Sequence, residues 1–322
     1  MINIICIIPS SGNNKTLLHL KKCLKSLNKS VVKEVAVKML LVTNNEYLRE
    51  QLLDCQINNF YLVDSALGFS EMNNLAIEES LRFYDSDYYL LINDDVWIET
   101  DFFANLLKID PSKFDLLNPL VFESDTSKID SFGSEYFTSG YAKNAFEVSI
   151  PTQLATAACL VIKTSFLKKM KLKYGFHFNP LLFYYMEDVE FSIRAKAIGG
   201  KIIRDLSLLA HHVGSLTSGK KSYFVMYQTY RNIVWVILLT WPTKFIFSHL
   251  LSILVVQGWA FIYSLQFSPL LYARALLNTF IHLADIYKGR TQIIEAYDKE
   301  FDFTTLFSRY AFRTHHGVTI KI

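Results

Sequence analysis

The chain has 322 residues, of which 51% are hydrophobic, 15% aromatic and 20% charged. Disorder requires low hydrophobicity and high net charge, so a disordered chain is excluded, and a chain of this length can build a core without disulfides. Its 33 Lys and Arg against 30 Asp and Glu give a net charge of +3, too small an excess to indicate a nucleic-acid partner. The mean hydropathy of +0.20 instead points to a membrane contact.

The four cysteines are spread from Cys6 to Cys159, with no CxxC pair and no histidine at zinc-finger spacing. We therefore expect reduced thiols and a cytoplasmic protein. Residues 1–9 lack the cationic start and the cleavage site of a signal peptide. Their apolar run predicts a first buried strand.

Over the first hundred residues, short apolar runs alternate with amphipathic segments. Gly68-Phe69-Ser70 opens a helix for which Ser70 is the expected N-cap, and Thr100 is the expected cap of another. Strand–helix alternation at this spacing predicts an α/β fold, a mostly parallel sheet covered by helices. The predicted strands are 2–8, 35–42, 60–63 and 88–92, and the predicted helices run over 17–27, 69–84 and about 101–107.

From residue 110 to 151 no clear period is present. Residues 153–163 are small and apolar, which predicts a buried strand. A helix is predicted over 187–198, because its start is acidic, its apolar residues recur every four positions, and Gly199-Gly200 follows. Two short strands are expected at 202–203 and 206–210, just before two histidines.

After about residue 222 the composition changes, and residues 245–273 contain no charged side chain. Such a run is long enough to span a membrane. However, Pro242 and Pro269 and several polar residues interrupt it, so helices in the membrane interface or a re-entrant hairpin fit at least as well. Trp235, Trp241 and Trp259 suit a bilayer interface. A helical dimer interface is the alternative that would also bury these apolar faces.

Three segments carry residues suited to chemistry. A predicted buried strand runs straight into Asn93-Asp94-Asp95, where carboxylates could hold a divalent cation that bridges phosphate oxygens. An aromatic run leads into a helix that begins with Glu187-Asp188, which could supply a general base. A histidine pair, His211-His212, could bind metal or phosphate. Taken singly, these segments equally fit an Asx turn, ordinary helix capping and a surface turn.

Taken together and in this order, the segments resemble the family 2 inverting glycosyltransferases of the GT-A fold. They are most similar to the rhamnosyltransferase-like branch that builds bacterial cell-surface polysaccharides. The resemblance covers nearly the whole chain. The residues that carry it are Ile7-Ile8-Pro9-Ser10, Leu67-Gly68-Phe69-Ser70 with Asn73-Asn74, Leu91-Ile92-Asn93-Asp94-Asp95-Val96, Met186-Glu187-Asp188-Val189-Glu190 with Arg194, His211 with Gly214-Ser215, and Tyr230-Arg231-Asn232.

The resemblance implies a nucleotide-diphosphate sugar donor and a divalent metal, Mn²⁺ or Mg²⁺. By the family's pattern, Asp188 matches the catalytic base and Glu187 would bind or orient the acceptor. Asp95, at the outer position of the family's DxD motif, looks like the metal ligand, and His211 matches a histidine near the diphosphate or metal. The residues implied to bind the nucleotide sugar are Pro9, Ser10, Thr43, Gly68, Asn74, Asn93 and Asp94.

The sequence departs from the family at the end of the second strand. Family members usually carry an Asp there that holds the base of the nucleotide, and this chain has Thr43. The segment after Pro9-Ser10 also differs from the family's Asn. These departures leave two alternatives open, a non-catalytic membrane-bound nucleotide-binding scaffold subunit and a sugar nucleotidyltransferase.

We therefore predict a GT-A catalytic domain at 1–218 and an apolar helical region at 219–322 that is membrane-associated, oligomerising or both. The predicted enzyme is an inverting, metal-dependent glycosyltransferase that moves a sugar to a lipid-linked glycan in cell-surface polysaccharide synthesis, such as that of lipopolysaccharide O-antigen. A rhamnosyltransferase is one form of this prediction. We expect it at the cytoplasmic face of the inner membrane, peripheral or re-entrant, with a homodimer as a further expectation.

Overall fold

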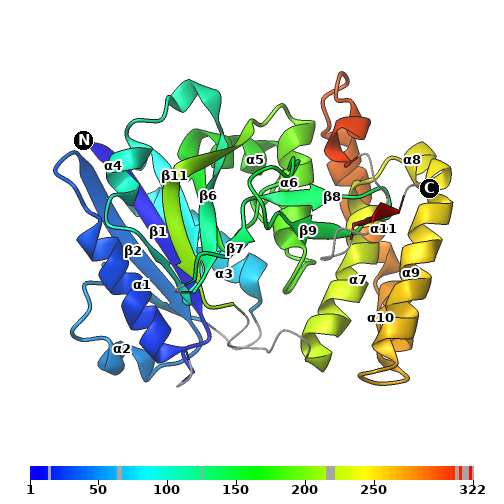
Figure 1. The fold of residues 1–322 in the computed structure, drawn as a ribbon, viewed down its shortest axis with the longest axis horizontal. Helices are drawn as coiled ribbons and strands as arrows, with labels where there is room; N and C mark the ends of the chain where they lie inside the picture. The colour runs from blue at the N-terminus through cyan, green and yellow to red at the C-terminus, as the bar shows by residue number, and fades with distance from the viewer. Residues whose placement is uncertain are drawn as a thin grey trace.

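The structure is a computed structural model, shown in Figure 1, that describes residues 1–13, 16–63, 67–124, 126–214, 222–308, 312–313 and 319–320. Its centre is a nine-stranded sheet with the order β3-β2-β1-β4-β10-β6-β11-β5, and β7 is paired to β6. The N-terminal four strands are parallel, as predicted. They are β1 (Ile2–Ser10), β2 (Val35–Thr43), β3 (Asn59–Leu62) and β4 (Tyr88–Ile92).

The other half of the sheet is mixed rather than parallel. β10 (Cys159–Lys163) runs antiparallel to both of its neighbours, β4 and β6 (Leu116–Glu123). β11 (Ile202–His212) is parallel to β6 and antiparallel to β5 (Val96–Ile98). The short β7 (Ile129–Ser131) pairs antiparallel with the end of β6. The two strands predicted at 202–203 and 206–210 are therefore one strand, with an irregularity between Asp205 and Leu209.

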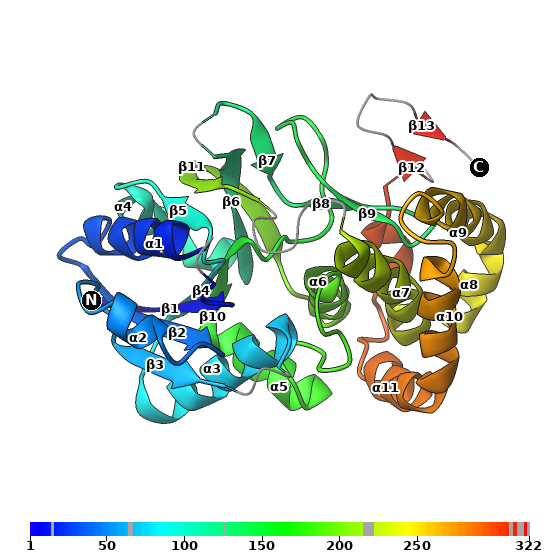
Figure 2. The ribbon, with the colours of Figure 1, turned by 90° about the horizontal axis from the view of Figure 1, so that it is seen from below.

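Helices cover both faces of the sheet, as Figure 2 shows edge-on. Because side chains alternate along a strand, Ile4, Cys6 and Ile8 of β1 belong to one apolar cluster and Ile5 and Ile7 to the other. The first cluster includes residues of α1 (Leu17–Lys29), α2 (Leu48–Gln51) and α4 (Phe102–Leu106). The second includes residues of α3 (Phe69–Phe83), α5 (Thr164–Tyr174) and α6 (Glu187–Ala197).

Two predicted helix starts are corrected. The N-cap of α3 is Gly68 rather than Ser70, which lies inside the helix and is fully buried. The N-cap of α4 is Asp101 rather than Thr100. At α3 a glycine is required by the close approach of the chain, since a Cβ at Gly68 would overlap the carbonyl of Phe183.

The C-terminal part is a group of helices beside the sheet (Figure 1). They share the second cluster with the sheet, so one core runs across both predicted regions; the boundary predicted at 218 lies outside the described residues. The remaining elements are α7 (Tyr223–Thr240), α8 (Thr243–Ser248), α9 (Leu250–Ser264), α10 (Leu271–Ile281), α11 (Leu283–Glu295), the 3₁₀ turns η1 (Pro111–Lys113) and η2 (Phe303–Leu306), the hairpin β8 (Ser134–Tyr136) and β9 (Ala142–Asn144), and the pair β12 (Phe312–Arg313) and β13 (Thr319–Ile320).

The tryptophans expected at a bilayer interface separate into two groups. Trp235 and Trp241 are buried in the core, where the indole N–H of Trp241 donates to the hydroxyl of Tyr136 at 2.9 Å. Trp259, by contrast, is 67% exposed on α9. Within the described ranges, no helix combines the length and the apolar character that a membrane crossing needs.

Candidate active site

A cleft of about 670 Å³ opens where β1 and β4 end and α6 begins. The carboxyl ends of parallel strands are the usual ligand site of open α/β sheets. Nineteen residues line this cleft: Pro9, Ser10, Ser11, Phe69, Met72, Asn93, Asp94, Asp95, Asn144, Thr156, Ala157, Ala158, Tyr184, Tyr185, Met186, Glu187, Asp188, Ser222 and Phe224. The two acidic motifs that are far apart in the sequence therefore face one cavity.

One wall of the cleft is built by the turn after β4. Asp94 is buried there and accepts a hydrogen bond from the Ser10 hydroxyl at 2.5 Å. Burial favours the protonated acid, and although the Ser10 hydrogen bond acts in the opposite sense, the pKa of Asp94 is raised to about 7. The β4 wall thus combines a serine hydroxyl and a carboxyl group that changes charge near neutral pH.

The histidine beside this wall is His212. Its Nε2 lies 3.2 Å from Asp95 Oδ1, and its Nδ1 lies 2.9 Å from Asp130 Oδ2. Burial on its own would lower the pKa of His212, but the hydrogen bonds to Asp130 and Asp95 raise it to about 10. The ring is therefore cationic in the protein alone, and it neutralises part of the acidic charge.

His211 was the histidine predicted for this role, and its ring faces elsewhere. Its Nε2 lies 2.7 Å from Glu99 and its Nδ1 lies 2.7 Å from the Ser124 carbonyl, while Trp97 stacks on the ring. Successive side chains of a strand point to opposite faces, and β11 continues through both histidines. The structure therefore assigns the position beside Asp95 to His212. Ser215, part of the same motif, lies outside the described residues.

The opposite wall is the first turn of α6. Asp188 accepts hydrogen bonds from the backbone N–H of Val189 at 2.8 Å and of Ala157 at 3.3 Å. Glu187 is buried, and its Oε2 has no hydrogen-bond partner among the described residues. Burial raises the pKa of both carboxyl groups, that of Glu187 to about 8, with the neighbouring Asp188 charge adding to the effect.

The turn that leads into α6 is strained. Tyr185 and Met186 have φ angles of 69° and 68°, a left-handed conformation that non-glycine residues rarely adopt. A buried amide holds it, because Asn232 Nδ2 on α7 donates to the carbonyls of Tyr184 at 2.8 Å and of Tyr185 at 2.7 Å. The first helix of the C-terminal group thereby fixes the approach to Glu187.

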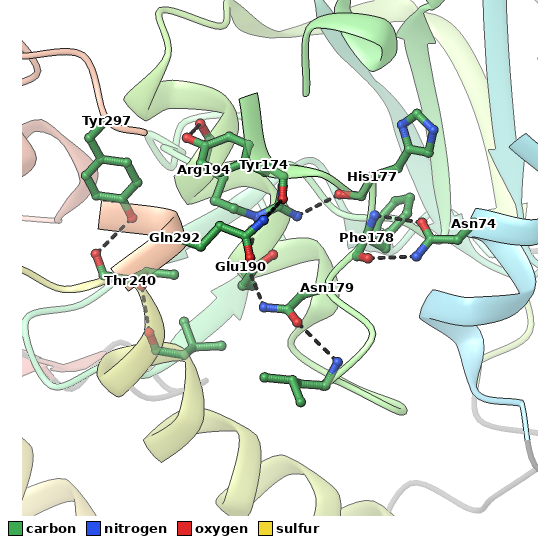
Figure 3. A network of polar contacts seen from close by, with 12 residues as sticks. Asn74, Tyr174, His177, Phe178, Asn179, Glu190, Arg194, Thr240, Gln292 and Tyr297 are labelled. Carbon is green, nitrogen blue, oxygen red and sulfur yellow. Dashed lines mark hydrogen bonds and ion pairs between the residues drawn. The ribbon is translucent and has the colours of Figure 1, made fainter. Parts of the chain in front are cut away.

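Behind the cleft, α6 is tied to its surroundings by the polar network in Figure 3. Glu190 and Arg194 are fully buried and form an ion pair at 2.8 Å. Arg194 also donates to the His177 carbonyl at 2.7 Å, and Glu190 accepts from Asn179 at 3.0 Å. Since a buried charge is tolerated only when paired, these bonds fix α6 against the 177–179 loop.

The residues predicted to bind the nucleotide sugar fall into two groups. Pro9, Ser10, Asn93 and Asp94 line the cleft. The other three, Thr43, Gly68 and Asn74, are not among its lining residues.

Contacts within the protein explain the second group. Asn74 uses both ends of its amide on the backbone of Phe178, donating to the carbonyl at 2.7 Å and accepting from the N–H at 2.8 Å (Figure 3). Thr43 is buried, and its hydroxyl accepts from the Asn45 backbone. Gly68 lets α3 start against Phe183, whose carbonyl accepts the Phe69 N–H at 2.8 Å.

A divalent metal fits this site only if a bound substrate supplies further coordinating atoms. Among the described residues, no three His, Cys, Asp or Glu side chains converge as a metal-binding group. Asp95 and His212 offer two, and Asp130 orients the imidazole as a carboxylate behind a metal-bound histidine would. Metal sites built from one or two protein ligands plus substrate phosphates have this composition.

Several cleft residues were not predicted from the sequence. Thr156, Ala157 and Ala158 line the cleft just before β10, within a stretch predicted to be strand throughout. Asn144 at the end of β9 and Phe224 in α7 also reach it. Of the cleft residues that were not predicted, only Tyr184 and Tyr185 left a signal in the sequence. They belong to the aromatic run before Glu187, and a run this rich in tyrosine suggests surfaces on which a ligand can stack.

No protein-family model and no curated protein matches the chain. Solved structures match its fold. TarS 1–349 of S. aureus, solved also in complex with UDP-GlcNAc, gives a TM-score of 0.50 at 15% identity and covers 95% of this chain and 83% of its own. The mannosyltransferase PcManGT from Pyrobaculum calidifontis, in complex with GDP-Man and Mn²⁺, gives 0.51 at 12% identity and covers 91% and 85%.

GalNAc-T7 with UDP, GalNAc and Mn²⁺ gives a TM-score of 0.54 at 13% identity, covering 74% of this chain and 48% of its own. A longer S. aureus TarS structure is covered over 40% of its length. The chain therefore spans less than half of these two proteins. The matches show that it has a GT-A-like glycosyltransferase fold, as predicted.

Proposed function

We propose that the chain is an inverting glycosyltransferase that transfers one sugar from a nucleotide-diphosphate donor to an acceptor hydroxyl. The observation that carries this is the convergence of Asp94-Asp95 and Glu187-Asp188 on one cleft. Neighbours of the same fold that were solved with UDP-GlcNAc or with GDP-Man support a donor of this class.

In this proposal Asp188 is the general base. Inversion requires in-line attack of the acceptor hydroxyl on the anomeric carbon, and the base removes the hydroxyl proton as the bond to the leaving diphosphate breaks. Asp188 is held in place by two backbone N–H groups, and burial raises its pKa toward the range where it can accept a proton. Glu187, at about pKa 8, keeps a proton at neutral pH and can donate a hydrogen bond to an acceptor oxygen.

The β4 wall receives the diphosphate. The cationic His212 lies between Asp95 and Asp130 and offsets part of their negative charge, so a diphosphate meets less repulsion at this wall. When bound, Mn²⁺ or Mg²⁺ would neutralise the negative charge of the leaving group, which commonly contributes several kcal/mol. Asp95 and His212 are the residues that would hold it, with His212 giving up the proton it carries in the protein alone, because a metal is bound by the neutral imidazole.

The finer parts of the proposal are the acceptor and the cellular site. The resemblance to rhamnosyltransferase-like enzymes supports a lipid-linked glycan acceptor in bacterial cell-surface polysaccharide or O-antigen synthesis. The large exposed apolar area on the C-terminal helices supports work at the cytoplasmic face of the inner membrane. A homodimer through those helices is the competing use of the same surface.

Product analysis with a panel of sugar nucleotides tests the proposal. The purified chain is incubated with UDP-, GDP- and dTDP-sugars, with and without Mn²⁺ or Mg²⁺, and the released products are separated. We expect one donor to release its nucleoside diphosphate in a metal-dependent manner. Formation of a nucleoside triphosphate and a sugar 1-phosphate when pyrophosphate is added would identify a nucleotidyltransferase instead, and binding of a donor without any release would identify a scaffold subunit.

A further inference from the structure

A second, smaller pocket of about 290 Å³ lies between α7 and α10. It sits next to the mouth of the cleft, because Tyr223 lines this pocket while its neighbours Ser222 and Phe224 line the cleft. The six lining residues are Tyr223, Tyr227, Arg274, Leu277, Asn278 and Ile281. We call it the α7–α10 pocket.

The α7–α10 pocket presents a cation without a matching acid. Arg274 is exposed and donates to the Tyr223 hydroxyl at 3.3 Å, and no carboxylate of the described chain pairs with it. The rings of Tyr223 and Tyr227 are nearly parallel, with centroids 6.2 Å apart. Arginine beside hydroxyl groups is a composition that suits phosphate.

One side of the pocket continues into an exposed apolar surface. Leu277 and Ile281, two of the lining residues, are 58% and 67% exposed. Figures 1 and 2 show α9 on the side of the helical group that faces away from the sheet. We define the outer apolar face by six exposed residues of α9 and α10: Leu251, Leu254, Trp259, Ile262, Leu277 and Phe280.

The charges around this face favour an anionic lipid surface over a second copy of the chain. From Leu206 to Ala284 the sequence contains no Asp or Glu, whereas Lys244 on α8 and Arg274 on α10 are exposed. A symmetric dimer through this face would bring two acid-free surfaces together, so Arg274 would find no carboxylate there. Lipid phosphates supply the missing negative charge, and the acyl layer receives the apolar side chains.

We propose that the α7–α10 pocket binds the headgroup of an anionic phospholipid while the outer apolar face enters the acyl layer. The mouth of the cleft then opens at the membrane surface, where a lipid-linked acceptor would be found. This last consequence rests on the proposed function, but lipid binding itself does not.

Flotation of the full chain with vesicles tests the headgroup. We expect stronger binding to phosphatidylcholine vesicles that contain phosphatidylglycerol than to phosphatidylcholine alone. Arg274→Gln should weaken the binding to anionic vesicles about fivefold, equivalent to ~1 kcal/mol for one basic residue at an anionic surface. Arg82→Gln is the matched control, because it removes the same charge from an exposed arginine at the end of α3 and should change nothing.

A second pair of variants tests the apolar face. Trp259→Ser should weaken binding to both kinds of vesicle severalfold, whereas Leu172→Ser on α5, where the side chain is 87% exposed, should not. No nucleotide sugar is present in these assays, so a failure of the proposed function leaves their result intact.

Three outcomes would overturn the proposal. Equal binding to the two vesicle types would show that the pocket does not bind an anionic headgroup. A dimer in solution that fails to float, and that Trp259→Ser dissociates, would assign the face to a second copy. A rise of the melting temperature in inorganic phosphate that Arg274→Gln abolishes, without any vesicle binding, would make the pocket a site for soluble phosphate.

Discussion

The two acidic walls of the cleft are held in different ways. On the β4 wall, Asp94 and Asp95 each face a side-chain donor, the Ser10 hydroxyl and the His212 imidazolium. On the α6 wall, Asp188 accepts from backbone N–H groups, and Glu187 leaves a buried oxygen without a described partner. The imidazolium beside Asp95 suits binding of a diphosphate, whereas Asp188, which faces backbone N–H groups and no cation, keeps its affinity for protons. In the proposed function, this difference makes the β4 wall a binding wall and the α6 wall a proton-transfer wall.

The largest effect is expected from removing the general base of the α6 wall. Asp188→Asn keeps the shape of the side chain and one of its two accepted hydrogen bonds but cannot accept the proton, so transfer should fall by about a hundredfold or more. Donor affinity, measured by calorimetry, should stay unchanged. Asp85→Asn, at an exposed position, is the control for a generic loss of charge. Turnover near that of the wild type would show that Asp188 is not the general base.

The second prediction concerns the β4 wall. Asp95→Ala should abolish the gain in donor affinity that Mn²⁺ or Mg²⁺ provides, while binding in the absence of metal persists. His212→Ala should reduce the same gain, and His211→Ala should not, because the ring of His211 faces Glu99. Donor titrations with and without metal give the comparison. An effect of His211→Ala equal to that of His212→Ala would contradict the assignment.

The third prediction concerns the positioning of the α6 wall. Asn232→Ala removes the amide that holds the left-handed turn at Tyr185 and Met186. A turn of this kind costs about 1–3 kcal/mol, so its relaxation should lower kcat about tenfold with donor affinity unchanged. A fall in melting temperature with normal kcat would show that Asn232 acts only on stability.

These contrasts show what the sequence could predict. The strands β1, β2 and β4 follow from buried apolar runs with clear polar stops, and the acidic pairs follow from their position at element ends. The antiparallel β10 and the parallel pairing of β6 with β11 could not be predicted, because the partners lie 44 and more residues apart and periodicity does not reveal pairing.

The choice of His211 rather than His212 has a local cause. The strand was expected to end at Ala210, which removed the alternation that separates His211 from His212. Asn74 and Thr43 resembled binding residues, but the backbone of Phe178 and of Asn45 uses their polar groups. The contact of Asn74 with Phe178 is tertiary and leaves no trace in a single sequence, whereas that of Thr43 with Asn45 is a local turn.

The fourth prediction is a pH dependence of stability. Glu187 has a pKa of about 8 in the folded protein and about 4.3 when unfolded, so between these values the folded state binds the extra proton. Stability from this group is fully present below about pH 4.3 and is lost as the pH rises through about 8. Glu187→Gln should therefore flatten the fall in melting temperature over this range. An unchanged slope would show that Glu187 is ionised in the folded protein.

The central claim is that the two walls act on opposite faces of one sugar, the α6 wall on the acceptor and the β4 wall on the leaving diphosphate. The most direct measurement is the anomeric configuration of the product, determined by NMR from a donor of known configuration. Our account predicts inversion at the anomeric carbon, with Asp188→Asn suppressing formation of this product. A product that retains the donor's configuration would contradict it, because a base that activates the acceptor for direct displacement cannot give retention.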